Sequence, residues 1–308
     1  MKEELQLLLK ACQLCPRQCS VNRLNGEKGF CQAGDKVKIA RADLHHWEEP
    51  CLSGTRGSGT VFFSHCTLKC VYCQNHEIST SGVGKEITSE ALGEIFLRLQ
   101  CEGAHNINLV TPTHYAPQII EGMDYARKKG FHLPVVYNSS GYESIDTLKL
   151  LEGYIDIYLP DFKYFKSTYG EKYSKAPHYR EYAQSTVTEM VRQVGKATFD
   201  EEGIMQKGVI VRHLMLPHLL FDSKKIVAYL ASTFKEQIYI SLLNQYTPLE
   251  QVKHIKELNQ KLDVRHYEWL TEYAITLGIE NGFIQEGDTA DESFIPAFTD
   301  QDDIIAIN

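Results

Sequence analysis

The chain has 308 residues, of which 43% are hydrophobic and 23% are charged, so it can bury a core the size of one α/β barrel or of two smaller domains. The net charge of -8 and the pI near 5.9 argue against a basic face for nucleic acid or for an anionic membrane. The sequence has neither a run of 18 apolar residues nor a signal sequence, so we expect a cytoplasmic protein that does not enter the membrane.

Residues 1–56 hold a first group of cysteines, and we expect this segment to be a small metal-binding unit. The group consists of Cys12, Cys15, Cys19 and Cys31. Disulfides are not expected in a cytosolic chain. Four thiolates close the coordination shell of a zinc ion or of a [4Fe-4S] cluster, so either metal is predicted to have a structural or electron-relay role. Independent free thiols are the remaining alternative. Cys51 and Cys101 stand alone and are expected to be small buried side chains.

Strand and helix patterns alternate over residues 57–285. Six strands are predicted at residues 59–64, 107–110, 133–137, 154–159, 209–215 and 238–243. Helical periodicity follows each strand, with Thr88 as the expected N-cap of the first helix and Pro117 at the start of the second. The capping box Thr247-Pro248-Leu249-Glu250 predicts the sixth helix. Six βα units with apolar strands predict a parallel sheet, either doubly wound or an incomplete barrel.

A second group of cysteines follows the first of these predicted strands directly. Cys66, Cys70 and Cys73 are spaced Cys-x3-Cys-x2-Cys, and sites in parallel α/β folds lie beyond the carboxyl ends of the strands. One loop with three thiolates can wrap a single [4Fe-4S] cluster and leave the fourth iron without a protein ligand. An open coordination position of this kind is where a substrate or cofactor binds.

This spacing, with Tyr72 just before the last cysteine, resembles the radical S-adenosylmethionine (SAM) superfamily. The closer resemblance is to its PflX branch, homologues of pyruvate formate-lyase activating protein. The stretches that carry it are CPRQC, NRLNGEKGFC, HHWEEPCLSGTRGSGTVFF, CVYCQN, HNINLVTPTHY, PVVYNSSGY, DIYLPDFKY and GVIVRHLMLP. The resemblance implies a partial (βα)6 barrel whose triple-cysteine loop holds a [4Fe-4S] cluster. SAM would bind the free iron and be cleaved reductively to a 5′-deoxyadenosyl radical, which abstracts hydrogen.

The resemblance also implies a SAM site at the strand ends. The residues expected to bind the cofactor are Tyr72, Thr111, Thr113, Asn138, Ser139, Ser140, Lys163 and Arg212. Thr111 and Thr113 stand where many relatives have a Gly-Gly-Glu turn, and one of the two is expected to contribute an oxygen. The alternative for them and for the polar residues after the third strand is a stiff turn and helix capping.

Two charged elements complete the predicted site. Asp161-x-Lys163 resembles the Asp-x-Lys motif of glycyl-radical activating enzymes, which implies that Lys163 meets the SAM carboxylate while Asp161 holds Lys163 or a cation. A surface ion pair is the alternative. Arg212 lies within an apolar strand, so it is expected to point into the barrel toward a carboxylate, whereas His213 faces the other way and is structural.

The sequence leaves two classes of substrate open. An activating enzyme would modify a glycyl-radical protein and needs an open barrel mouth, whereas an enzyme for a small molecule or a peptide needs a closed pocket. Either would take electrons from a donor of the flavodoxin or ferredoxin type. A non-catalytic metal-binding protein is a third alternative. The acidic tail, residues 286–308, is expected to form a lid or an interaction arm.

Overall fold

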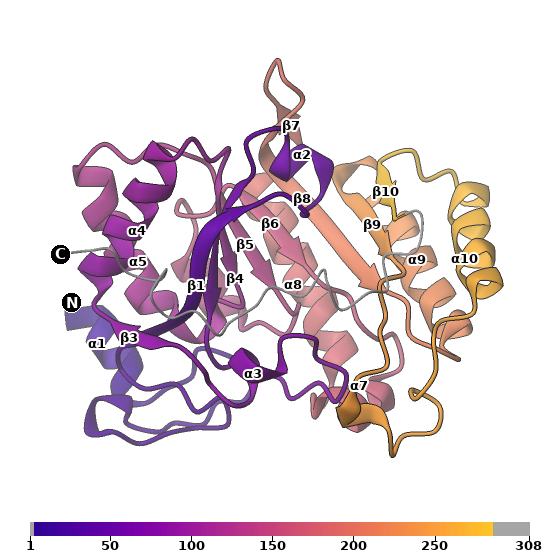
Figure 1. Ribbon diagram of the computed structural model, residues 1–308, viewed down its shortest axis with the longest axis horizontal. Helices are drawn as coiled ribbons and strands as arrows, with labels where there is room; N and C mark the ends of the chain where they lie inside the picture. Colours follow the sequence, from indigo (N-terminus) through magenta and orange to yellow (C-terminus); the bar gives the residue numbers. More distant parts are fainter. Residues whose placement is uncertain (1–2, 286–308) are drawn as a thin grey trace.

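The computed structural model describes residues 3–285 (Figure 1). The acidic tail lies outside the described residues. A curved sheet forms the centre of the molecule, with strand order β10-β9-β8-β6-β5-β4-β2-β1-β3 and with β7 paired to β8 alone. The strands are β1 (Val37–His45), β2 (Ser58–Phe63), β3 (Lys85–Ile87), β4 (Ile107–Val110), β5 (Val135–Ser139), β6 (Ile157–Pro160), β7 (Thr198–Phe199), β8 (Met205–Leu214), β9 (Tyr239–Leu243) and β10 (Gly282–Ile284).

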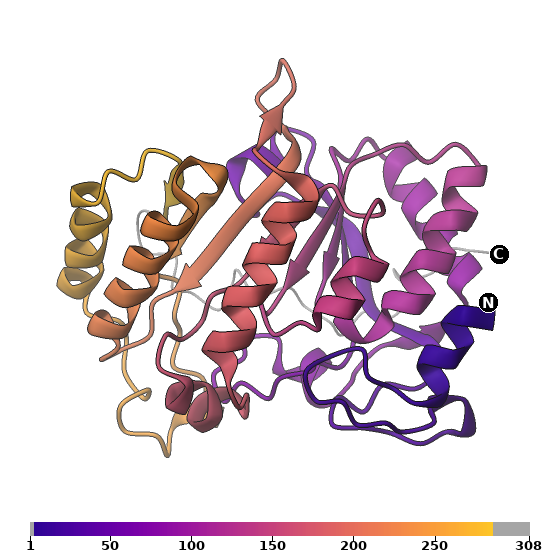
Figure 2. The ribbon, with the colours of Figure 1, turned by 180° about the vertical axis from the view of Figure 1, so that it is seen from behind.

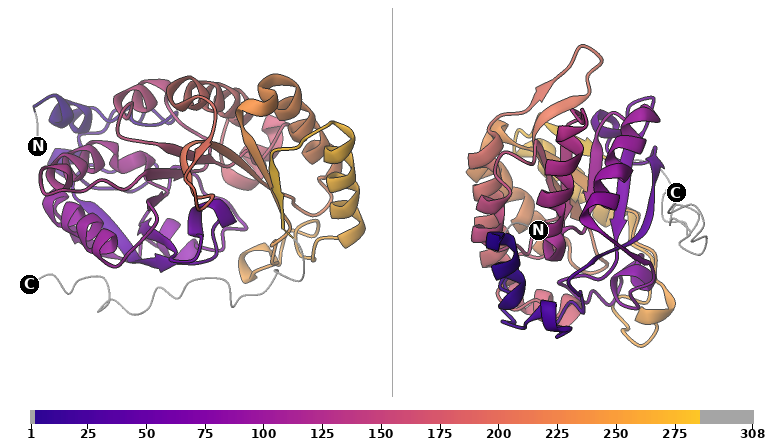
Figure 3. Two further views of the ribbon diagram at one scale, coloured as in Figure 1. Left: turned by 90° about the horizontal axis from the view of Figure 1, so that it is seen from above. Right: turned by 90° about the vertical axis from the view of Figure 1, so that its left-hand side faces the viewer.

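The strands from β2 to β10 along this order are parallel to one another, and β1 and β3 add an antiparallel margin beyond β2. The two ends of the order, β3 and β10, do not pair, so the sheet is not closed. A mixed α/β fold with a mostly parallel, open sheet confirms the predicted partial barrel. Figure 3 shows the curvature from above, with helices around the outside.

Most helices of the described residues pack on the outer face of the sheet (Figure 2), whereas the one-turn helices α2 (Pro50–Ser53) and α3 (His76–Ser79) lie at its two ends (Figure 1). The others are α1 (Glu3–Lys10), α4 (Ser89–Cys101), α5 (Ala116–Lys128), α6 (Ile145–Leu150), α7 (Ser167–Ser174), α8 (Tyr179–Val194), α9 (Leu220–Phe234) and α10 (Val264–Thr276). Thr88 caps α4 as predicted, since its Oγ1 accepts a hydrogen bond from the Ala91 N–H at 3.1 Å. Within residues 3–285 no helix is long and apolar enough to span a membrane.

Two sequence-based expectations are wrong, and one strand was not predicted. The capping box at residues 247–250 starts only a 3-10 turn, Glu250–Val252, and the helix forms later, after Asp263. Val252 and Leu258 are buried in consecutive turns rather than in an α-helix, because their apolar contacts do not require helical geometry. Cys51 is buried as expected, but Cys101 is exposed at the end of α4. Residues 37–45, where no strand was predicted, form β1 and pair with β2.

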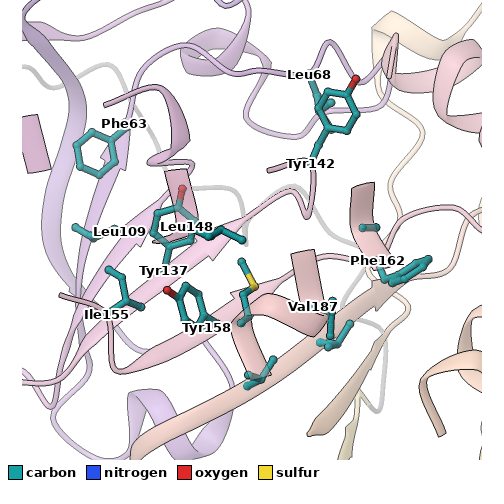
Figure 4. Packing of buried hydrophobic residues seen from close by; sticks show 14 of the residues in the cluster. Phe63, Leu68, Leu109, Tyr137, Tyr142, Leu148, Ile155, Tyr158, Phe162 and Val187 are labelled. Carbon is teal, nitrogen blue, oxygen red and sulfur yellow. The ribbon is translucent and has the colours of Figure 1, made fainter. Parts of the chain in front are cut away.

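The core lies between the sheet and its helices and reaches the cysteine loop. Tyr137 of β5 and Tyr158 of β6 are fully buried, with ring centroids 5.9 Å apart (Figure 4). Leu68 of the cysteine loop is 1% exposed and belongs to the same apolar cluster as Tyr142. Burial of a leucine side chain contributes about 1.5 to 3 kcal/mol, so the loop is anchored by the core itself.

Two glycines provide a test of how tightly the loops after β5 and β6 pack against each other. Gly141 lies in the loop after β5, and Gly153, between α6 and β6, is the control. Gly141 has φ 71° and a Cβ there would lie 2.1 Å from the Asp161 carbonyl oxygen, whereas Gly153 has φ 82° with nothing within 4 Å. Both Gly→Ala changes cost about 1 kcal/mol in backbone strain. Gly141→Ala should lose a further ~1 to 3 kcal/mol from the clash. If urea unfolding gives both variants the same loss in free energy of unfolding, the loops after β5 and β6 do not pack tightly against each other.

Candidate functional site

The triple-cysteine loop, residues 64–75, connects β2 to α3 at the carboxyl end of the sheet. Its backbone is held by neighbouring segments: Lys69 N–H donates to the Ser174 carbonyl at 3.1 Å, and Val71 N–H donates to the Tyr173 carbonyl at 2.8 Å. His65 has a positive φ of 74°, an uncommon conformation that turns the chain just before Cys66. The end of α7 and the core therefore fix the shape of the loop.

The three thiols of this loop are close enough to affect one another. Burial raises the pKa of Cys66 to about 12, and the neighbouring Cys70 and Cys73 raise it further, while burial also raises the pKa of Cys70. Among residues 3–285 no three His, Cys, Asp or Glu side chains gather around a point where a single metal ion would sit. A [4Fe-4S] cluster spreads its ligands over the corners of a larger body. Its irons would neutralise thiolates that otherwise repel each other, so the donor set suits a cluster.

A chain of buried hydroxyl groups ends on one of these sulfurs. The Tyr72 and Tyr164 hydroxyls are 2.6 Å apart, Tyr164 OH lies 2.7 Å from Ser174 Oγ, and Ser174 Oγ donates to Cys70 Sγ at 3.0 Å. Because Ser174 donates to sulfur, its oxygen must accept from Tyr164, and Tyr164 in turn accepts from Tyr72. Tyr72 thus has its hydroxyl bonded within the protein, and its role in binding a cofactor stays a prediction.

Four side chains meet across the ends of β5, β6 and β8. The Asp161 carboxylate accepts hydrogen bonds from Lys163 Nζ at 2.6 Å and from Arg212 Nε at 3.2 Å. Arg212 also donates to Asn138 Oδ1 at 2.6 Å and to Glu48 Oε2 at 3.3 Å. The side chains of Lys163, Asp161 and Arg212 are 17%, 22% and 17% exposed. Apart from the Asp161–Lys163 pair, these contacts join residues that lie 51 to 164 positions apart in the chain.

Electrostatics keep this network charged. Burial raises the pKa of the Asp161 carboxyl, but Lys163 and Arg212 outweigh it, so its pKa is lowered. Burial also lowers the pKa of Lys163, and Asp161 and Cys70 reverse that effect, so its pKa is raised. Lys163 therefore stays protonated, with the Asp161 carboxylate as its hydrogen-bond partner.

Sequence reasoning missed two carboxylates on the loop before α2. Glu48 pairs with Arg212, and Glu49 is 7% exposed with no hydrogen-bond partner for its Oε2. Burial raises the pKa of Glu49 to about 7, although Arg212 opposes the shift. Both residues lie within the stretch HHWEEP, but no strand was predicted at residues 37–45. Without β1 beside β2, nothing placed these carboxylates against the barrel interior.

The threonines of the turn after β4 differ in their surroundings. Thr113 is 1% exposed, and its Oγ1 donates to Glu143 Oε1 at 2.9 Å, so its hydroxyl is already used within the protein. Thr111 is less buried and has φ 61°, which is a strained conformation for a β-branched residue. Strained residues cluster at binding sites. The hydroxyl of Thr113 is thus engaged with Glu143, and Thr111 is the more accessible of the two.

The remaining predicted residues lie near the same strand ends. Ser139 is buried with its hydroxyl near Gly141 N–H, and the carbonyl of Ser140 accepts from Tyr179 OH at 2.8 Å. His213 is buried and bonds both the Phe162 carbonyl and Ser223 Oγ, which agrees with its predicted structural role. Burial lowers the pKa of His213 to about 4, so the ring is neutral.

A partial barrel of parallel strands, with three thiols on the loop after the first of them and a cation beside that loop, defines a class of iron-sulfur proteins that bind SAM. The model of the Radical SAM superfamily matches residues 60–230, and the chain belongs to this superfamily. Membership implies cleavage of SAM with an iron-sulfur cluster. It names no substrate.

The chain is similar to several further proteins. It is 29% identical to an uncharacterized protein, MJ0674, of Methanocaldococcus jannaschii over 276 residues, 87% of this chain and 75% of that protein. The FeFe-hydrogenase maturase HydG from Carboxydothermus hydrogenoformans shares the fold with a TM-score of 0.50 and 12% identity, over 75% of this chain and 54% of that one. Streptococcus suis SuiB, bound to precursor peptide SuiA, matches with a TM-score of 0.48 and 13% identity, over 72% of this chain. The chain spans about half the length of SuiB, 46%.

The buried carboxyl group of Glu143 makes stability depend on pH. Burial raises the pKa of Glu143 from 4.5 to about 7, against the hydrogen bonds from Thr113 and Tyr137. The folded state therefore holds this proton more tightly, and the free energy of unfolding should fall as pH rises from 4.5 to about 7, by up to ~3 kcal/mol. Glu143→Gln should flatten the slope, while Glu90→Gln on the exposed face of α4 should leave it unchanged. A slope that survives Glu143→Gln would refute this assignment.

Proposed function

We propose that the chain is a radical SAM enzyme in which Cys66, Cys70 and Cys73 hold the [4Fe-4S] cluster and Lys163 binds the carboxylate of SAM. The cluster, when bound and reduced, supplies the electron for the reductive cleavage of SAM. The observation that carries the proposal is the position of Lys163, a partly buried cation that donates to Asp161 at 2.6 Å and lies close enough to Cys70 of the loop to act on it electrostatically.

Lys163 has the donors for this role. An ammonium group has three N–H bonds, and in the described part of the chain only the one to Asp161 is satisfied. The others can reach a carboxylate placed beside the cysteine loop. Asp161 keeps Lys163 charged and oriented, so we assign the pair to SAM binding and to the positioning of the sulfonium for cleavage.

Arg212 is better described as a positioning residue. Its guanidinium donates to Asp161, Asn138 and Glu48, which leaves little capacity for a ligand. It holds the ends of β5, β6 and β8 in register and fixes the Asp161 carboxylate that orients Lys163. Its loss should therefore affect SAM through Lys163.

We further propose that the substrate is a macromolecule, a glycyl-radical protein that the enzyme activates. The resemblance to the PflX branch supports this, and so does a sheet that is not closed, with the Lys163 network partly exposed at its carboxyl end. A small molecule or a peptide is the alternative substrate. The electron donor would be of the flavodoxin or ferredoxin type. A doublet resonance of a glycyl radical, formed only with SAM and a candidate partner protein, would establish activation.

The SAM site is tested with anaerobically reconstituted protein. Lys163→Ala should weaken SAM binding roughly 10- to 150-fold, because a charge-assisted contact contributes about 1.5 to 3 kcal/mol. Arg212→Ala should also weaken SAM binding, but less, because Arg212 acts only by positioning Lys163 through Asp161. Lys207→Ala, an exposed lysine of the same strand as Arg212, is the matched control and should bind SAM normally. With dithionite, wild-type protein should form 5′-deoxyadenosine and methionine, and the Cys66, Cys70, Cys73→Ala variant should not. Formation of S-adenosylhomocysteine instead would point to methyl transfer.

The hydroxyl chain predicts a change in redox potential. Hydrogen bonds to cluster sulfurs are among the factors that set the reduction potential of iron-sulfur centres, and a donated bond stabilises the more negative, reduced state. Ser174→Ala removes the donor to Cys70, so the midpoint potential of the cluster should become more negative. Ser185→Ala, on the exposed face of α8, removes only bonds to helix carbonyls and is the control. An unchanged potential in both variants would show that Ser174 does not act on the cluster.

A further inference from the structure

Arg23 is a fully buried arginine without a carboxylate partner. Its side chain is 1% exposed, and its Nε and NH1 donate to the carbonyls of Gly34 at 2.7 Å and His114 at 2.6 Å. No Asp or Glu among residues 3–285 forms an ion pair with it. A guanidinium group stays charged in proteins, and a buried charge is costly unless an opposite charge lies nearby. These carbonyls and the Tyr115 ring, 5.7 Å away, supply only partial negative charge, so an anion beside Arg23 would stabilise it.

The amino-terminal cysteines lie close to this charge. Arg23 is near enough to act electrostatically on Cys31, as are Cys12 and Cys19, and Cys12 and Cys31 in turn lie near Cys15. Arg23 also donates to the carbonyl of Gly34, three residues after Cys31. Cys15 and Cys31 are each 8% exposed. Thiols bind a metal as thiolates, so a metal here would place negative charge beside Arg23.

The backbone around the cysteines is folded to present their sulfurs to one another. Cys12 N–H donates to the Val21 carbonyl at 3.0 Å, and Ser20 N–H donates back to the Cys12 carbonyl at 2.9 Å. Phe30 N–H donates to Cys19 Sγ at 3.4 Å, and a Cβ on Gly29 would lie 2.8 Å from that sulfur. A peptide N–H aimed at sulfur stabilises a thiolate. Only glycine leaves space for the sulfur at position 29.

We propose that Cys12, Cys15, Cys19 and Cys31 hold a [4Fe-4S] cluster with closed coordination, and that Arg23 is its buried counter-charge. Four thiolates around an oxidised cluster core leave a net negative charge, which is the anion that Arg23 lacks. The proposal does not depend on the function of the barrel.

Location favours a cluster over zinc. Arg17, between Cys15 and Cys19, donates to the Thr67 carbonyl at 3.1 Å, next to Cys66, so the two cysteine loops are neighbours. A redox-active cluster suits this position beside the loop of the superfamily's iron-sulfur cluster, whereas zinc has no redox chemistry.

The metal is identified in the full chain carrying Cys66, Cys70, Cys73→Ala, so that the barrel cluster does not contribute. After anaerobic reconstitution this protein should retain about four irons and about four sulfides per chain. Adding Cys31→Ser should remove most of them. One zinc with no iron, or no metal at all, would overturn the proposal. Because SAM cleavage is not measured, failure here is distinct from failure of the proposed function.

The counter-charge is tested in the same background with two substitutions. Arg23→Met should lose most of the iron or release it faster to a chelator, and the midpoint potential of any remaining cluster should be more negative. Arg23→Lys keeps the charge and should keep the cluster. Arg127→Met is the control, since exposed Arg127 also bonds a carbonyl, that of Gly153, and lies 5.0 Å from a tyrosine ring. If Arg23→Lys loses the cluster as readily as Arg23→Met, or if Arg23→Met keeps both iron and potential, the charge is not what matters.

Discussion

The arrangement of the candidate site depends on one partly buried carboxylate, Asp161. Its two oxygens accept from Lys163 and Arg212, while its backbone carbonyl accepts from Tyr179 OH at 3.0 Å. These contacts join the loop after β6 to β8 and to the start of α8. Breaking one partner of a buried ion pair costs more than the pair contributes, because it leaves an uncompensated charge. The geometry of the cation beside the cysteine loop therefore follows from the integrity of Asp161.

Much of the fold could be predicted because the parallel strands are buried on both faces and the helices are amphipathic. The strand at residues 107–110 matches β4, and Thr88 caps the next helix, since both signals are local. The helix expected after Thr247 failed for a nonlocal reason, because Val252 and Leu258 bury their side chains equally well in turns. β1 was missed because its register is set by β2 rather than by its own pattern.

Some residues of the candidate site could likewise be predicted from the sequence and others could not. Cysteine spacing is a local property of the chain, so both groups could be recognised from sequence, as could Asp161 and Lys163. Glu49 and Glu143 could not, since each becomes unusual only through burial against residues that are distant in the chain. The sequence did not single out Arg23 either, because an arginine in a polar stretch is ordinary. It becomes unusual only in the fold, where it is buried and forms no ion pair with a carboxylate of residues 3–285.

The contact between the two cysteine loops has a consequence for the assembly of the protein. Arg17 packs on the Phe30 ring at 3.7 Å and binds carbonyls of both the Cys66 loop and the residue after α7, so each loop helps to order the other. Coupling of this kind is reciprocal: a centre that orders one loop lowers the entropy cost of filling the second. With the proposed clusters in both loops, maturation would be cooperative, and partly loaded chains would be rarer than independent filling would give.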